Sequence, residues 1–266
     1  MKLGIGSYTY MWSIGFERTR PAQPLSAFDL LERARQLGVR VVQFGPNLPL
    51  EDVDLERLGD EAAGADIEVE LGATGLTPAH LEAPLAACRR LGAKLLRSVD
   101  LYEGPSPSAQ ELERSCRAVL PLLEASGVRL AIENARIPAA AMAEALNAIG
   151  SPWLGVTLDT VNSLSIPEGP EHVTRTLARH TLCLHVKDFT VKRIWHMMGF
   201  TVEGAAVGKG HLNIPWLLES LREAGADPNA ILELWVPQQD SLEVTIALEQ
   251  AWAIESVAYL RTLIPD

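Results

Sequence analysis

Short apolar segments alternate with amphipathic ones along almost the whole chain. Eight apolar runs rich in Val, Ile and Leu are expected to form strands, at residues 3–7, 39–44, 67–71, 94–99, 128–133, 154–158, 181–186 and 230–235. Most of these runs do not alternate polar with apolar positions. This pattern is typical of parallel strands that are buried on both faces.

The amphipathic segments between these runs are expected to form helices. They cover residues 24–37, 77–91, 108–125, 138–149, 171–179, 215–224 and 242–263. Four of them end at or just before a glycine: Gly38, Gly92, Gly127 and Gly150. Glycine accepts the left-handed conformation that closes a helix before the chain enters the next strand.

Eight strands that alternate with helices predict an α/β fold, a single (β/α)8 TIM barrel in one domain over residues 1–266. An open sheet that binds a dinucleotide would carry a glycine-rich fingerprint after its first strand. Residues 7–12 contain no glycine, and the chain shows no linker and no low-complexity tract. The sequence therefore favours a closed barrel.

Charge and composition narrow the range of partners. The chain is 47% hydrophobic and has 34 acidic and 23 basic side chains, for a net charge of −11. Such a chain repels phosphate backbones and anionic lipids, so we expect no nucleic acid and no membrane surface as a partner. The three cysteines have no paired spacing and the N-terminus has no signal-peptide pattern, so we expect a cytoplasmic protein.

Four potential metal ligands stand at the predicted carboxyl ends of the last four strands, where the active sites of such barrels lie. They are Glu133, Asp159, His185 and Glu233. Three carboxylates and one imidazole favour one divalent ion such as Mn, Mg or Co. An ion that holds a carbonyl oxygen and the neighbouring hydroxyl stabilises an enediolate, and carboxylates beside it can act as base and acid. Each residue alone could instead be a solvated strand end or a helix cap.

Five short motifs carry a family resemblance. They lie at residues 132–134, 158–162, 185–188, 208–210 and 232–235. These motifs resemble the xylose isomerase-like TIM-barrel family, the sugar phosphate isomerase/epimerase superfamily, and the resemblance covers essentially the whole chain. It implies that Glu133, Asp159, His185 and Glu233 bind the metal, and that Glu133 and Glu233 are catalytic and exchange protons with the substrate from opposite faces. One position departs from the family pattern, since Asn162 stands where a substrate-contacting histidine is usual.

Segment 188–212 is the longest connection between a predicted strand and the next helix, and long connections are often functional. Lys187, Arg193 and His196 lie in or beside it. In an acidic chain these cations favour an anionic substrate such as a sugar acid, a keto acid or a phosphate. The segment could instead be a solvated loop, or a contact in a homo-oligomer through Trp195 and its methionine neighbours.

Three further residues on the same rim are predicted to bind substrate: Asn162, Arg97 and Gln43. Pairing of Arg97 with the many acidic groups is an equal alternative. The sequence Gly208-Lys209-Gly210 could cradle a phosphate, but two glycines around a lysine are a weak signal. The favoured interpretation is a tight turn into a helix that Asn213 caps.

Two enzymatic hypotheses share this site. The first is a divalent-metal-dependent isomerase or epimerase that acts on a keto-sugar or sugar acid through an enediolate. The second is a lyase, either a decarboxylase of a 3-oxo sugar acid or a dehydratase, because loss of CO2 leaves the same kind of anion. Residues 185–189 and 198–200 resemble a subgroup described as 3-oxo-isoapionate decarboxylases. A repair enzyme like endonuclease IV is opposed by the net charge, and a non-catalytic binding barrel would bind no metal tightly.

Overall fold

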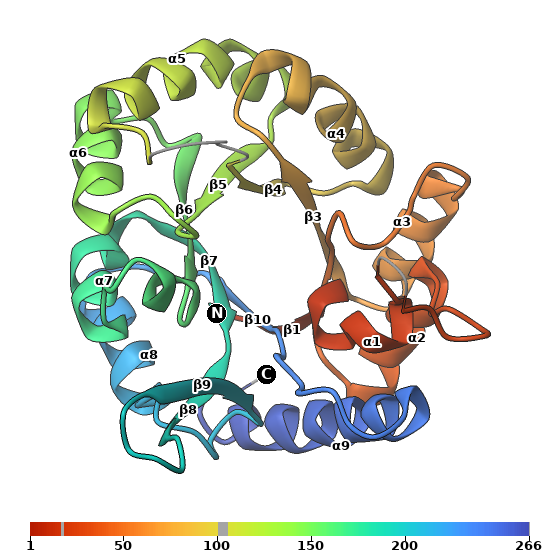
Figure 1. Cartoon of the computed structure of the whole chain (residues 1–266). Coiled ribbons are helices and arrows are strands. Elements are labelled where there is room, and N and C mark those ends of the chain that lie inside the picture. Colours follow the sequence, from red (N-terminus) through yellow and green to blue (C-terminus); the bar gives the residue numbers. More distant parts are fainter. Residues whose placement is uncertain (17–18, 101–105, 266) are drawn as a thin grey trace.

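Eight parallel strands close into one barrel in the computed structural model of the chain (Figure 1). The structure describes residues 1–16, 19–100 and 106–265. The barrel strands are β1 (Leu3–Gly6), β2 (Val41–Phe44), β3 (Glu68–Thr74), β4 (Leu95–Val99), β5 (Arg129–Glu133), β6 (Leu154–Asp159), β7 (Thr181–Val186) and β10 (Asn229–Leu232). Their order around the barrel is β1-β10-β7-β6-β5-β4-β3-β2, and the predicted (β/α)8 fold is confirmed.

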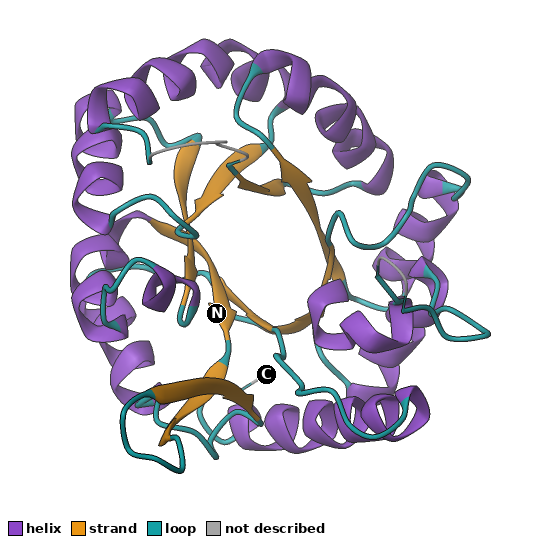
Figure 2. Cartoon of the chain, viewed as in Figure 1, coloured by secondary structure: helices purple, strands orange, loops and turns teal. Residues whose placement is uncertain are grey.

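Helices form a ring outside the strands (Figure 2). All the helices expected from the sequence are present: α2 (Ala27–Leu37), α4 (Pro78–Leu91), α5 (Ala109–Ser126), α6 (Ala139–Ile149), α7 (Pro170–Leu177), α8 (Ile214–Glu223) and α9 (Leu242–Arg261). α3 (Leu55–Gly64) is not expected from the sequence, because its two glycines weaken the helical pattern. Gly59 is nevertheless required, since a Cβ there would lie 2.8 Å from the carbonyl oxygen of Leu91 in α4.

Four short helical segments lie in the connections between the longer elements. η1 (Ser7–Tyr10) and α1 (Met11–Ile14) follow β1, η2 (Asn162–Ser165) follows β6, and η3 (Ala178–His180) precedes β7. The hydroxyl of Thr9 donates to the carbonyl oxygen of Leu232 at 2.5 Å, and the Leu234 amide donates to the Tyr8 carbonyl at 3.3 Å. These bonds hold η1 against the carboxyl end of β10.

The interior of the barrel has an apolar layer and a polar layer. Val41, Leu95, Ala131, Cys183 and Ile231 are buried and form a small apolar cluster separate from the main core. Residues i and i+2 of a strand point to the same face. The residues two positions further along these five strands therefore also point into the barrel: Gln43, Arg97, Glu133, His185 and Glu233. The polar layer lies on the carboxyl side of the apolar one.

The segment after β7 is a hairpin rather than the irregular loop that the sequence suggested. β8 (Asp188–Arg193) and β9 (Phe200–Ala205) pair in antiparallel fashion along their whole length. Figure 1 shows this hairpin, in teal, outside the closed barrel. The expectation of a loop is wrong because the β-branched residues of both strands favour extended pairing. Among the described residues, no helix has the length and apolar character needed to span a membrane.

Candidate metal centre

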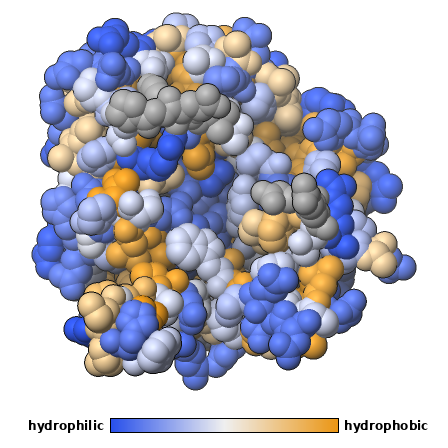
Figure 3. All heavy atoms as spheres, in the orientation of Figure 1, coloured by the Kyte–Doolittle hydropathy of each residue, from blue (hydrophilic) through white to orange (hydrophobic). Residues whose placement is uncertain are grey.

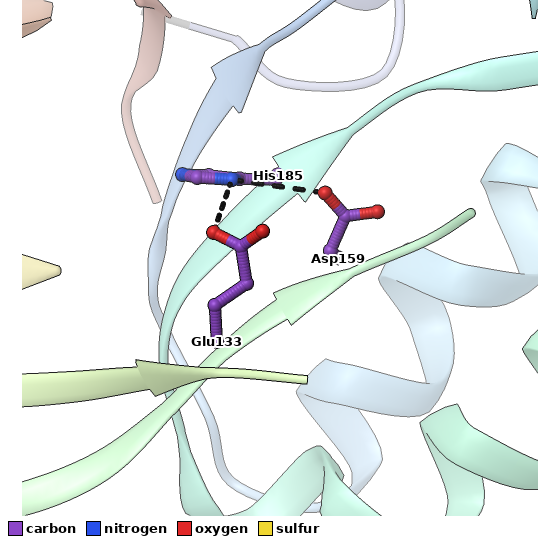
Figure 4. Close-up of side chains that lie close together, drawn as sticks. All are labelled: Glu133, Asp159 and His185. Carbon is purple, nitrogen blue, oxygen red and sulfur yellow. Dashed lines mark ion pairs between the residues drawn. The ribbon is translucent and has the colours of Figure 1, made fainter. Parts of the chain in front are cut away.

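Glu133, Asp159 and His185 lie close together at the carboxyl ends of β5, β6 and β7 (Figure 4). One ligand atom from each lies within 4.8 Å of the others, and all three residues are buried. The Nδ1 atom of His185 is 3.4 Å from Glu133 Oε2 and 3.8 Å from Asp159 Oδ2. Glu233, just after β10, adds its Oε1 at 3.1 Å from the same nitrogen. The tertiary structure thus brings together the four residues that the sequence singled out.

Two buried atoms in this group have free lone pairs that could bind a cation. The Nε2 atom of His185 lies 2.9 Å from the amide oxygen of Gln43, so Nε2 carries the proton and Nδ1 presents a lone pair. Neither that Nδ1 nor Glu233 Oε1 has a hydrogen-bond partner within the described part of the chain. A divalent ion between them would satisfy both atoms. Three carboxylates and one imidazole are a donor set that Mn, Mg, Co or Zn accepts.

Asp159 is held in place by backbone and side-chain hydrogen bonds. Its Oδ1 accepts from the amides of Val161 and Asn162, both at 2.9 Å, which leaves Oδ2 directed at the group. Asn134 accepts from the Asp159 amide at 2.6 Å and donates to the Asp159 carbonyl at 3.1 Å. Asn134 therefore positions a ligand, a role that its place in the motif after β5 does not reveal.

Two cations are buried beside the carboxylates. Arg97 forms an ion pair with Glu133, and each side chain is almost completely buried. Lys187 lies 2.6 Å from Asp159 Oδ2 and 2.8 Å from Glu233 Oε2. Burial alone would raise the pKa of Glu233, but His185 and Lys187 outweigh it and hold that pKa below its ordinary value. Glu233 is therefore a weak base in this environment.

Asn162 connects the two halves of the site. It donates to Glu133 Oε1 at 2.6 Å, and its amide oxygen accepts from Lys187 at 3.3 Å. Both carboxylate oxygens of Glu133 thus have a partner, since Arg97 holds the other one. The predicted substrate-binding residues Asn162, Arg97 and Lys187 are all brought to the centre.

The aromatic residues Tyr8 and Trp235 lie against these cations. The guanidinium of Arg97 is 5.6 Å from the centroid of the Tyr8 ring, and Lys187 Nζ is 5.1 Å from that of Trp235. Burial, the largest influence, raises the pKa of Tyr8 although Arg97 opposes it, so its hydroxyl stays protonated. Figure 3 shows a hollow with hydrophilic side chains at the centre of this face.

The three remaining predicted substrate-binding residues have other partners in the structure. Gln43 is buried with its amide engaged by His185 on one side and Glu70, at 2.9 Å, on the other. Arg193 donates to the carbonyl oxygen of Met197 and is exposed in the hairpin. His196 is also exposed there. A substrate contact by Arg193 or His196 stays a prediction.

The carboxylate of Asp188 occupies the turn that was considered for phosphate. Its Oδ2 accepts from the amides of Gly208 at 3.0 Å and Gly210 at 2.8 Å, and its Oδ1 accepts from Leu212 at 3.1 Å. Asn213 caps the helix that follows by accepting from the Trp216 amide. An internal anion already uses these amide groups, which supports the interpretation of a tight turn.

Comparison with known proteins places this geometry in a family. Residues 31–263 match the family described as the xylose isomerase-like TIM barrel. This chain belongs to that family. The resemblance to this family that the strand-end motifs indicated is confirmed.

Three relatives of this xylose isomerase-like barrel are informative. A 3-oxo-isoapionate decarboxylase of Pectobacterium atrosepticum is 31% identical over 100% of this chain and 97% of its own. A D-psicose 3-epimerase with D-tagatose from Clostridium cellulolyticum has 16% identity, a TM-score of 0.73 and 99% coverage of both chains. The IOLI protein with a binding zinc atom has 18% identity and a TM-score of 0.72, with coverage of 97% of this chain and 99% of its own. The two structures share the fold with this chain.

Proposed function

We propose that this protein is a divalent-metal-dependent decarboxylase of a 3-oxo sugar acid. The ligand set is Glu133, Asp159, His185 and Glu233. The relative at 31% identity over the full chain is described as a 3-oxo-isoapionate decarboxylase, which supports this reaction class. The structural observation that carries the proposal is the direct pairing of Arg97 with Glu133 and of Lys187 with Glu233.

Arg97 and Asn162 hold the two carboxylate oxygens of Glu133, while His185 and Lys187 hold the pKa of Glu233 below its ordinary value. An isomerase or epimerase must first remove a proton from carbon, and a carboxylate that a buried cation stabilises has little tendency to take one. Decarboxylation requires no such base, because the carbon loses CO2 instead of a proton. The pairing of both candidate bases therefore favours decarboxylation over isomerisation.

The charge of the site favours an anionic substrate. Three carboxylates face two buried cations, which leaves one net negative charge, and a divalent ion changes this to one net positive charge. Glu70 lies deeper in the barrel, where it contacts Cys183 and Asn229. An acid with one carboxylate would neutralise the loaded centre, whereas a neutral ketose would leave it charged.

The reaction follows from this arrangement. A bound divalent ion would polarise the 3-oxo group and stabilise negative charge on its oxygen. The C1–C2 bond breaks, its electron pair moves into the C2–C3 bond and on to the carbonyl oxygen, and CO2 leaves. Lys187 and Arg97 attract the substrate and stabilise the charge as it moves from carboxylate to oxygen. C2 then takes a proton from water.

Incubation of the metal-loaded protein with 3-oxo sugar acids in D2O tests the proposal. We expect CO2 release, one deuterium on the product carbon that was C2 of the substrate, and loss of turnover after chelation. The variants Glu133→Gln and Glu233→Gln should lose at least about 100-fold in turnover, because each removes a charged ligand. Recovered substrate that carries deuterium and has lost no carbon would instead establish isomerisation or epimerisation, the second candidate.

A further inference from the structure

A chain of buried polar side chains runs from His185 into the barrel, away from the metal side. The amide oxygen of Gln43 lies 2.9 Å from His185 Nε2, and the Gln43 nitrogen donates to Glu70 Oε2 at 2.9 Å. Asn229 donates to the other Glu70 oxygen at 3.0 Å and to Glu68 at 3.1 Å. Gln43, Glu70 and His185 are each at most 3% exposed.

The hydrogen bonds in this chain of side chains run in one direction because Glu70 is a carboxylate. Glu70 is an acceptor toward both Gln43 and Asn229, so the Gln43 amide must turn its NH2 group toward Glu70 and its oxygen toward His185. An oxygen facing Nε2 requires the proton on that nitrogen. The lone pair of His185 is then on Nδ1, the atom that faces Glu133, Asp159 and Glu233.

We infer that Gln43 and Glu70 are positioning residues that select the metal-binding tautomer of His185. A neutral histidine with its proton on Nδ1 would present N–H to the ion and could not bind it. The carboxylate of Glu70 sets the amide of Gln43, and that amide sets the imidazole. Neither Gln43 nor Glu70 touches the substrate in this role. Partners of metal-bound histidines commonly change metal affinity by 10 to 100-fold.

The inference rests on the metal site of the proposed function but not on its reaction, so its test uses the metal alone. Zn²⁺ and Co²⁺ affinities are measured by calorimetry for the wild type and Gln43→Leu. Gln43→Leu removes both hydrogen bonds at similar volume. We expect this variant to bind about 10 to 100-fold more weakly.

The double variant Gln43→Glu/Glu70→Gln exchanges the hydrogen-bond donor and acceptor between positions 43 and 70. A carboxylate at position 43 would accept from His185 Nε2 and from the new amide at position 70, so the proton on Nε2 is retained. We expect this double variant to recover affinity to within about threefold of the wild type. Glu82→Gln is the matched control, because it makes the same change at an exposed site on α4, outside this chain of hydrogen bonds, and it should leave affinity unchanged.

A second readout reports the tautomer itself. In the zinc-loaded wild type, ¹⁵N NMR should show the proton of His185 on Nε2 and a metal-bound Nδ1, and thermal unfolding of the metal-free variants checks that each folds. Wild-type affinity in folded Gln43→Leu would overturn the inference. So would a double variant that binds as weakly as Gln43→Leu, or a proton found on Nδ1. CO2 release plays no part in these outcomes, so they leave the proposed reaction to its own test.

Discussion

At the scale of single residues, Lys187 holds one oxygen from each of two predicted metal ligands. Its ammonium group is within 2.8 Å of Asp159 and Glu233, and both acids are predicted metal ligands. Burial alone would lower the pKa of Lys187, but these acids raise it well above its ordinary value, so the charge is permanent. The centre is therefore partly neutralised before any ion binds.

Lys187→Met should separate metal binding from turnover. Removal of a positive charge a few ångströms from the ion should tighten Co²⁺ binding by at least about tenfold. Turnover of an anionic substrate should fall by at least about 100-fold, because the group that stabilises the shifting charge is lost. Calorimetry and steady-state kinetics measure the two effects. Weaker Co²⁺ binding in this variant would show that Lys187 does not oppose the ion.

At the scale of elements, the sequence motif at the end of β7, residues 185–188, serves two different purposes. His185 and Lys187 point into the candidate metal centre, whereas Asp188 closes the turn that leads from β9 to α8. This division follows the geometry of the strand end: β7 stops at Val186, and the hairpin begins at Asp188. The β-branched residues of the hairpin were visible in the sequence, but their pairing was not, because it depends on a turn with no marked glycine pattern.

Gly210→Ala should destabilise this turn. A Cβ at position 210 would lie 2.1 Å from Asp188 Oδ1, so the carboxylate must leave its backbone partners. We expect a loss of about 3 kcal/mol in the free energy of unfolding and a clear drop in Tm.

The matched control for this turn is Gly64→Ala at the end of α3. A Cβ there meets no atom within 4 Å, so its Tm should stay the same or rise slightly. Equal Tm values for the two variants would contradict the role given to Asp188.

At the scale of the whole molecule, Glu249 joins the two ends of the chain. This buried residue of α9 accepts from the amides of Trp12 at 2.7 Å and Ser13 at 3.0 Å, and from the Ser13 hydroxyl at 2.5 Å. The Trp12 ring donates in turn to the Val236 carbonyl at 2.9 Å. These bonds hold the segment after β1 against the last helix and so fix one side of the catalytic rim.

Glu249 should make stability depend on pH. Burial outweighs the Ser13 and Trp12 hydrogen bonds and the charge of Arg33, and it raises the pKa to about 7 from an ordinary 4.5. The folded chain therefore holds an extra proton between pH 4.5 and 7. Stability from this group is complete below pH 4.5 and falls by about 3 kcal/mol as pH rises to 7. Glu249→Gln should flatten this part of the Tm–pH curve, and parallel curves for the two proteins would contradict the assignment.

The sequence by itself determined the order of the barrel strands, most helix boundaries and which four residues are the candidate ligands. These follow from local rules: buried parallel strands are short and apolar, helices close at glycine, and polar residues begin where strands end. These rules did not predict α3, because Gly59 weakens its helical pattern. Glycine is required there by the close contact with α4, which only the tertiary structure shows.

Only the tertiary structure decided what each polar residue at the rim does. Gln43 faces His185 and Glu70, and Asn162 links Glu133 to Lys187. These partners are 25 to 142 residues apart in the chain. Local patterns place a side chain on a strand face, but closure of the barrel decides which side chains come into contact. Those contacts determine the charge of the site, the tautomer of His185 and the basicity of Glu233.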